Sequence, residues 1–214
     1  MQGTMQMKIL YCIIHTIAQK EREDFILSTW GRNKDLVFYG DYETTGNKYL
    51  LKVSDNSDYT SGEEKQINAI STFPKTHNNY NWYYFCDNDT FVNTKLLEEF
   101  SQDCDQNKIY GEIANTWPKD PSLSYPVGGA GFLVSNKILN FLSNKVFHNS
   151  VNWGDVSLGL NLRHFKIEKT SREDLFHSQT PEFYGIQDTE IKNHISFHYI
   201  KNYETMAKLN ELCK

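Results

Sequence analysis

Continuous apolar runs alternate with amphipathic stretches along the first half of the chain. The run at 8–14 (KILYCII) and the run at 82–86 (WYYFC) have apolar residues at successive positions, not only at alternate ones. This pattern is typical of strands that are covered on both faces of a sheet. Similar short runs predict further strands at 36–39, 49–53 and 109–113.

The stretches between these runs have the spacing of amphipathic helices. We expect one helix at about 18–30 and another at 60–73, where Thr60 and Glu63 have the spacing of a capping box. Further helices are expected after the capping residues Asn93 and Ser135, and near the C-terminus around Met206, Leu209 and Leu212. Strands that alternate with helices indicate an α/β fold with a largely parallel sheet.

The overall composition is that of one globular domain. The chain has 214 residues, is 39% hydrophobic and has a formal net charge of −5, which argues against a nucleic-acid-binding protein with a basic face. It contains neither an apolar run long enough for a transmembrane segment nor a secretory signal, so we expect a soluble, cytoplasmic protein. The four cysteines form no CxxC pair, which favours free thiols over zinc ligands or disulfides.

Two carboxylates, Asp87 and Asp89, directly follow the predicted strand at 82–86. Buried carboxylates need a cation or hydrogen bonds to replace their lost hydration. Ligands of open α/β sheets bind at the carboxyl ends of the strands, so this position suits a ligand site. The alternative is a turn in which Asp and Asn side chains bind their own backbone. A second acidic pair, Asp103 and Asp105, follows no predicted strand, so the three-residue pattern is not specific by itself.

Three chemistries use acidic pairs with this spacing. A calcium loop needs another oxygen ligand and then a glycine, where this chain has Phe91 and Val92. A phosphatase of the haloacid-dehalogenase type has Thr or Val at the place of Phe91 and a second late acid that the segment 154–161 lacks. The third chemistry is nucleotide-sugar transfer, in which one acid binds sugar hydroxyls and the other binds a divalent ion on the diphosphate.

Segments spread over most of the chain resemble the Fringe and β-1,3-galactosyltransferase group of GT-A glycosyltransferases. FCDNDTFVNTKLLEEF (85–100) is similar to the group's DDDTFV-type segment. Four further matches occur in the group's order: STW (28–30), YPVGGAGFLVS (125–135), GDVSLG (154–159) and SFHYI (196–200). The resemblance implies a GT-A fold, with a Rossmann-like, mainly parallel central sheet flanked by helices and a smaller acceptor-side subregion. It also implies inverting transfer of a sugar from a UDP donor to a hydroxyl, usually assisted by manganese.

The resemblance assigns a metal site to Asp89, His198 and Asp87, with Asp89 as the direct ligand and Asp87 also contacting donor hydroxyls. Asp87 and Asp89 are thus nucleotide-sugar candidates as well. Carboxylate and imidazole ligands with open positions suit Mn²⁺, whereas a set of oxygen ligands alone would favour Mg²⁺. A cation that bridges the phosphates would stabilise the charge of the departing UDP. Without the resemblance, a single histidine in a strand is more often a packing residue.

The resemblance places the catalytic base at Asp155, in the segment that matches the group's Glu-Asp-Val motif. The chain departs from that motif because Gly154 replaces the acid. The alternative role for Asp155 is the N-cap of a helix that carries Val156 and Leu160.

Other candidate residues for donor and acceptor binding each have a structural alternative. Thr16, Asp41, Lys65 and Asn88 are nucleotide-sugar candidates, and their alternatives are capping, turn or surface roles. Arg22 resembles an arginine of the family, or is an exposed helix charge. The backbone at Gly128 and Gly129 could approach a sugar closely, or form an ordinary turn. Trp153 and Trp117 could stack on a sugar, or be partly buried core residues.

These observations predict a single GT-A domain over 1–214, in which about 7–115 binds the nucleotide sugar and about 116–214 forms the acceptor and catalytic half. The predicted partners are a UDP-sugar and a glycan or glycoprotein acceptor, with Mn²⁺ or Mg²⁺ as cofactor and without nucleic acid. Such a free-standing module is of the kind that bacteria or large viruses encode. The alternatives are a retaining glycosyltransferase, a dehalogenase-type phosphatase and a non-catalytic sugar-binding module.

Overall fold

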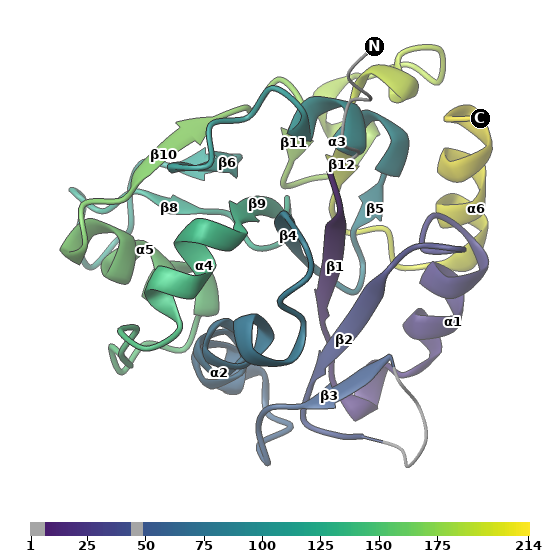
Figure 1. The fold of residues 1–214 in the computed structure, drawn as a ribbon. Coiled ribbons are helices and arrows are strands. Elements are labelled where there is room, and N and C mark those ends of the chain that lie inside the picture. Colours follow the sequence, from purple (N-terminus) through teal and green to yellow (C-terminus); the bar gives the residue numbers. More distant parts are fainter. Residues whose placement is uncertain (1–6, 44–48) are drawn as a thin grey trace, which may run out of the picture.

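A seven-stranded sheet forms the centre of the molecule in the computed structural model (Figure 1). The structure describes residues 7–43 and 49–214, so residues 1–6 and 44–48 of the predicted domain lie outside the described residues. The strand order is β10-β6-β9-β4-β1-β2-β3, and every strand except β9 runs in the same direction. The strands are β1 (Ile9–Ile14), β2 (Leu36–Gly40), β3 (Leu50–Lys52), β4 (Trp82–Asp87), β6 (Lys108–Gly111), β9 (Phe132–Ser135) and β10 (Glu168–Ser171).

Helices cover both faces of this sheet, which explains the continuous apolar runs of β1 and β4. Tyr11 and Tyr84 point to the face packed by α1, α3 and α6, whereas Leu10 and Tyr83 point to the face packed by α2, α4 and α5. The helices are α1 (Glu21–Ser28), α2 (Gly62–Thr76), α3 (Thr94–Ser101), α4 (Asn136–Leu142), α5 (Gly154–His164) and α6 (Tyr203–Leu212). The prediction of an α/β fold with a mainly parallel sheet is confirmed.

Two of the predicted helix caps are present and one is absent. The side chains of Asn93 and Ser135 accept hydrogen bonds from the backbone N–H of Leu96 (3.2 Å) and Ile138 (3.1 Å). The capping box at 60–63 is wrong, because α2 begins at Gly62 and the side chain of Glu63 binds a distant segment instead. The helix predicted at 18–30 is shorter, since a 3₁₀ turn at Ile17–Gln19 precedes α1.

Two small sheets bring the second half of the chain against the first. β5 (Phe91–Val92) pairs antiparallel with β12 (Ser196–Phe197), which also pairs with β11 (Phe176–His177). A two-stranded sheet joins β7 (Ile113–Ala114) and β8 (Tyr125–Pro126). The predicted strand at 109–113 is therefore divided between β6 and β7. The β5–β12 pairing places residues that follow β12 beside those that precede β5.

The described residues bear on two further predictions from the sequence. Within 7–43 and 49–214, none of the helices combines the length and the apolar character that crossing a bilayer would require. All four cysteines are free thiols, with Cys12 and Cys86 buried and Cys104 and Cys213 half-buried. The absence of disulfides among these cysteines agrees with the prediction.

Candidate active site

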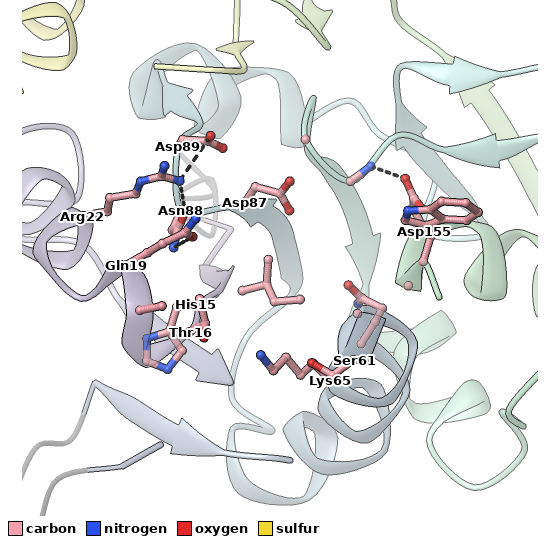
Figure 2. A pocket seen from close by; sticks show the side chains of 18 of the residues that line it. His15, Thr16, Gln19, Arg22, Ser61, Lys65, Asp87, Asn88, Asp89 and Asp155 are labelled. Carbon is pink, nitrogen blue, oxygen red and sulfur yellow. Dashed lines mark hydrogen bonds and ion pairs between the residues drawn. The ribbon is translucent and has the colours of Figure 1, made fainter. Parts of the chain in front are cut away.

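A pocket of about 620 Å³ opens at the carboxyl ends of β1 and β4 (Figure 2). Its walls come from the ends of β1 and β4, the first turns of α2 and α5, the turn at 128–129 and the segment 198–201. Figure 2 shows Asp87 between Asp155 on one side and Arg22 with Gln19 on the other. The pocket therefore unites residues from both halves of the chain.

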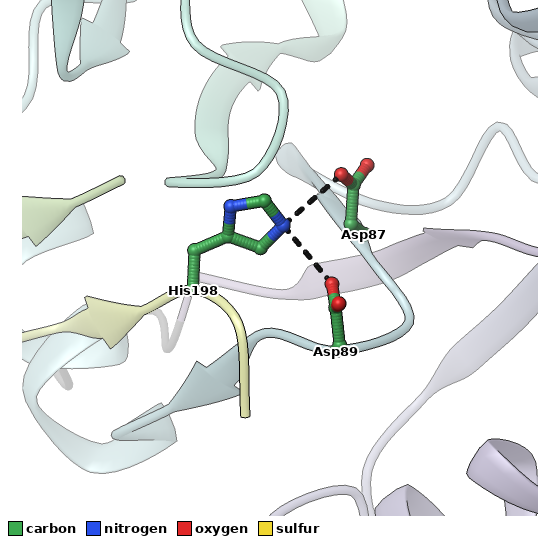
Figure 3. Close-up of side chains that lie close together, drawn as sticks. All are labelled: Asp87, Asp89 and His198. Carbon is green, nitrogen blue, oxygen red and sulfur yellow. Dashed lines mark ion pairs between the residues drawn. The ribbon is translucent and has the colours of Figure 1, made fainter. Parts of the chain in front are cut away.

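Asp87, Asp89 and His198 form a cluster within this pocket that could hold a metal ion (Figure 3). Each offers one ligand atom, and these atoms lie within 4.8 Å of one another. His198 Nε2 lies 3.0 Å from an oxygen of Asp89 and 3.4 Å from an oxygen of Asp87. Two carboxylates and an imidazole nitrogen that converge on one point are a suitable ligand set for a divalent cation. The arrangement fits the metal site that the resemblance implies.

The carboxylates of the cluster favour positive charge at the imidazole. Burial by itself lowers the pKa of His198, but the hydrogen bonds and charges of Asp87 and Asp89 outweigh it and raise the pKa to about 9. Burial likewise acts to raise the pKa of Asp89, but the hydrogen bond and charge of His198 and the charge of Arg22 lower it. Asp89 therefore stays ionised and attracts cations, as a metal ligand must.

Arg22 reaches the other side of Asp89, although its sequence context also suited an exposed charge. Its Nη1 lies 3.3 Å from Asp89 Oδ2 and donates to Asn88 Oδ1 at 2.8 Å. Asn88 Nδ2 in turn donates to Gln19 Oε1 at 3.0 Å. Asp89 thus lies between His198 and Arg22, and its lost hydration is replaced by two cationic partners.

The structure brings Thr16, Asp41 and Lys65 together at one wall of the pocket. Asp41 accepts a hydrogen bond from Thr16 Oγ1 at 3.1 Å and forms a buried ion pair with Lys65 Nζ at 3.5 Å. Thr16 and Lys65 line the pocket and Asp41 does not. Asp41 is consequently placed to orient the other two side chains, and its own contact with a nucleotide sugar stays a prediction.

Asp155 lies at the first turn of α5, with both carboxylate oxygens bound to backbone amides. Oδ2 accepts from Gly128 N at 3.2 Å and Oδ1 accepts from Val156 N at 2.7 Å. The N-cap alternative is wrong, because α5 begins at Gly154 and Trp153 occupies the N-cap position. Burial raises the pKa of Asp155 to about 6, although these amide hydrogen bonds act against the increase. A carboxylate with this pKa suits proton transfer near neutral pH.

Two glycines of the segment 128–131 are required by the packing of the site itself. A Cβ at Gly129 would lie 2.2 Å from His198 Nδ1, and one at Gly131, where φ is +80°, would lie 2.0 Å from Tyr84 Oη. A Cβ at Gly128 would be at an ordinary contact distance of 3.6 Å from Asp155. Gly128 and Gly129 both line the pocket. Gly129 is therefore needed to seat the imidazole of His198.

We expect Gly129→Ala to lower stability and metal-dependent ligand binding, because the added methyl group displaces His198. Overpacking of a buried site costs about 1–3 kcal/mol. Gly128→Ala is the matched control, since its methyl group meets Asp155 only at van der Waals distance. Thermal unfolding of both variants measures the difference, and equal melting temperatures would show that the His198 loop moves without cost.

The close approach of α5 to α2 explains why glycine stands before Asp155. A Cβ at Gly154 would lie 2.5 Å from the Cβ of Gln66 and 2.7 Å from the backbone oxygen of Gly62. The acid that the family motif carries at this position therefore has no room here.

Two aromatic side chains, Trp153 and Tyr199, line the pocket. Trp153 is 42% exposed and lines the pocket, whereas Trp117 lies outside it with Lys119 over its ring. Tyr199, which the sequence analysis did not single out, stacks on His198 with ring centroids 3.9 Å apart. Its φ of 60° is unusual for a non-glycine residue and identifies a constrained backbone at the site. No local sequence pattern indicates that conformation.

Comparison with known proteins decides the family. The family model described as Fringe-like matches residues 7–212. The chain belongs to this family. The resemblance to glycosyltransferases seen in the sequence is thus confirmed, and the cluster of Asp87, Asp89 and His198 lies within the matched residues. No curated protein matches the chain significantly in sequence.

Solved structures share the fold at low sequence identity. A glycosyltransferase involved in the glycosylation of the major capsid of PBCV-1 matches with a TM-score of 0.52 at 14% identity, covering 94% of this chain and 98% of the other. The apo form of the glycosyltransferase GlyE of Streptococcus pneumoniae TIGR4 matches with a TM-score of 0.50 at 16% identity, covering 91% of this chain. This chain spans 55% of the GlyE chain. These matches confirm the predicted GT-A fold.

Proposed function

We propose that the chain transfers a sugar from a UDP-sugar to a hydroxyl group of a glycan or glycoprotein, with inversion at the anomeric carbon and with a divalent metal ion. The observation that carries this proposal is that Asp155 lies in the same pocket as the cluster of Asp87, Asp89 and His198, on the side opposite to Asp89 and Arg22 (Figure 2). An inverting transfer needs the base and the leaving group on opposite sides of the anomeric carbon, and the leaving group is proposed to bind beside Asp89.

Asp89 and His198 would hold the metal ion, which would take the place of the proton on His198 Nε2, with Asp87 beside it toward the donor sugar. When bound, the ion supplies positive charge that stabilises the diphosphate leaving group. The mixed carboxylate and imidazole ligand set favours Mn²⁺ over Mg²⁺. Thr16, Lys65 and Asn88 line the side of the pocket proposed for the nucleotide sugar, with Asp41 orienting the first two.

In the proposed reaction, Asp155 removes the proton of the acceptor hydroxyl. The resulting oxygen nucleophile forms a bond to the anomeric carbon while the bond from that carbon to the phosphate oxygen breaks, so UDP leaves and Asp155 holds the proton. The amides of Gly128 and Val156 orient the carboxylate. Gly128, Gly129 and the exposed ring of Trp153 would border the sugars.

The pH dependence of transfer should report the titration of Asp155. Only the ionised carboxylate accepts a proton, so kcat/KM should increase with pH through a pKa of about 6 and level off above it. Protonation of Asp155 removes the base, so the rate falls toward low pH, and the raised pKa places this fall at about pH 6. Initial rates from pH 4.5 to 8 at saturating metal measure this acid limb. A profile without a limb between pH 5 and 7 would contradict the assignment.

A thermal-shift experiment with nucleotides tests the donor assignment without knowledge of the acceptor. A ligand at roughly 100 times its Kd stabilises the folded state by about 2.7 kcal/mol. We expect UDP to raise the melting temperature with Mn²⁺ present and to have little effect with EDTA. GDP and CDP serve as controls for nucleotide specificity, and an equal shift by all three would contradict a UDP site.

The cytoplasmic location expected from the sequence stays a prediction.

A further inference from the structure

Glu63 is a buried carboxylate outside the pocket that binds the segment leading to Asp155. Its side chain lies on α2 and is 7% exposed. Oε1 accepts hydrogen bonds from Asn149 N and, at 2.7 Å, from Ser157 Oγ, and Oε2 accepts from Val151 N at 3.2 Å. No lysine, arginine or histidine in the described ranges 7–43 and 49–214 forms an ion pair with it. Three neutral donors therefore stabilise this charge.

The turn that supplies two of these donors has an uncommon backbone conformation. Ser150, between the two amides, has a φ of 58°. The left-handed region is unfavourable for a non-glycine residue. Alternation of right- and left-handed residues lets neighbouring amides converge on one anion, and here that anion is the carboxylate of Glu63. The turn at 149–151 thus directs the amides of Asn149 and Val151 to the side chain of Glu63.

The same segment continues directly into the proposed catalytic site. Asn152, Trp153, Gly154 and Asp155 follow the turn and line the pocket. Ser157, the third partner of Glu63, stands two residues beyond Asp155 and is fully buried. Glu63 therefore binds the chain on both sides of Asp155, before it at the turn and after it in α5.

Additional contacts fasten this segment to α5 itself. Asn149 Nδ2 donates to Ser157 Oγ at 2.9 Å. The side chain of Asn161 both donates to the backbone oxygen of Phe147 and accepts from its N–H. These bonds connect the turn to α5. Among the hydrogen bonds of the described residues, those of the Glu63 side chain connect both the turn and α5 to α2. The backbone of α5 at Gly154 also lies close to that of α2 at Gly62.

The start of α2 also carries residues that line the pocket. These are the N-cap residue Ser61 and, in the first turns, Lys65 and Gln66, all within three residues of Glu63 in sequence. One helix end therefore presents groups to the pocket and, through Glu63, holds the segment that presents Asp155. We propose that Glu63 is a positioning residue, which fixes the segment 149–157 on α2 and so sets the place of Asp155 relative to the donor-binding residues. The effect on transfer rests on the proposed role of Asp155 as base.

Glu63→Gln is the variant that tests this role. The amide keeps the size of the side chain but removes the charge and places an N–H₂ group against one of the three donors. We expect kcat for transfer to fall about 10- to 100-fold, since a displacement on the order of 1 Å can cost about 100-fold in rate. UDP affinity with Mn²⁺ should stay within about twofold. Glu64→Gln, at the next residue of α2 and without a hydrogen bond to the 149–157 segment, should behave like the unchanged protein in both respects.

The pKa of the Asp155 carboxyl group supplies a readout that a purely structural role would not change. Carbon-13 NMR titration of that carboxyl should give a value near 6 in the unchanged protein and Glu64→Gln, and a lower value in Glu63→Gln because the displaced side chain gains hydration. The titratable groups that face Asp155 are Asp87 and Tyr125, and neither substitution alters them. If Glu63→Gln lowers only the melting temperature, with kcat and this pKa unchanged, the proposal is wrong.

A second variant keeps the test decisive if Glu63→Gln does not fold. Ser157→Ala removes one partner of Glu63 and leaves the two backbone donors in place, so a smaller change in the same direction is expected. An unchanged kcat and Asp155 pKa in Ser157→Ala would then overturn the proposal. Failure of the proposed function is distinguishable, because the NMR titration reports the position of Asp155 whether or not Asp155 is the base.

Discussion

Replacing Asp155 with asparagine is expected to reduce sugar transfer by roughly two to four orders of magnitude, the usual range for losing general acid–base assistance. Asparagine preserves the size of the side chain and can still accept the hydrogen bond from Val156 N. Its N–H₂ group would face the N–H of Gly128, so that contact is lost. The raised pKa of Asp155 shows that its buried charge lowers the stability of the folded state at neutral pH, so removing the charge should offset the lost contact and keep the melting temperature near that of the unchanged protein. UDP binding with Mn²⁺ should stay unchanged.

The assay for Asp155→Asn is the rate of UDP release, with thermal unfolding and calorimetry of UDP as controls. Hydrolysis of the donor without acceptor serves while the acceptor is unknown, although water needs the base less than a sugar hydroxyl does. Turnover like that of the unchanged protein would remove the base from the inverting mechanism and move the retaining alternative ahead.

Replacing Asp89 with alanine is expected to abolish metal-dependent UDP binding while the fold persists. The substitution removes a proposed metal ligand, but His198 keeps its contact with Asp87 and Arg22 keeps its hydrogen bond to Asn88. The backbone oxygen of Asp89, which accepts from Ile200 N at 2.8 Å, is unaffected. Isothermal calorimetry with UDP and Mn²⁺ measures the loss.

Asp103→Ala is the matched control for Asp89→Ala. Asp103 belongs to the other acidic pair of the sequence, in an exposed stretch between α3 and β6. Its replacement should leave UDP affinity unchanged. Equal UDP affinity in Asp89→Ala and in the unchanged protein would contradict the metal assignment.

The sequence predicted those parts of the fold and site that depend on local pattern. The apolar run at 82–86 becomes β4 because both faces of the central strand are covered, and its end places Asp87 and Asp89 at the pocket. Asn93 and Ser135 cap their helices because capping depends on neighbours two or three residues away.

Other parts of the site depend on contacts between distant residues, which local pattern does not contain. Pairing of β12 with β5 brings His198 to Asp89, and only the family resemblance indicated that contact. Glu63 has the spacing of a capping box, yet its side chain binds Ser157, 94 residues away. The left-handed backbone of Tyr199 has no local sequence signal.

The central claim, metal-dependent inverting transfer from a UDP-sugar, is tested most directly by the anomeric configuration of the first product. A panel of α-linked UDP-sugars is incubated with the protein and Mn²⁺, and proton NMR follows the released or transferred sugar before mutarotation. The predicted result is UDP release that requires the metal ion, with the β-anomer formed first. Formation of the α-anomer first, or the lack of metal-dependent UDP release from every donor in the panel, would contradict the account.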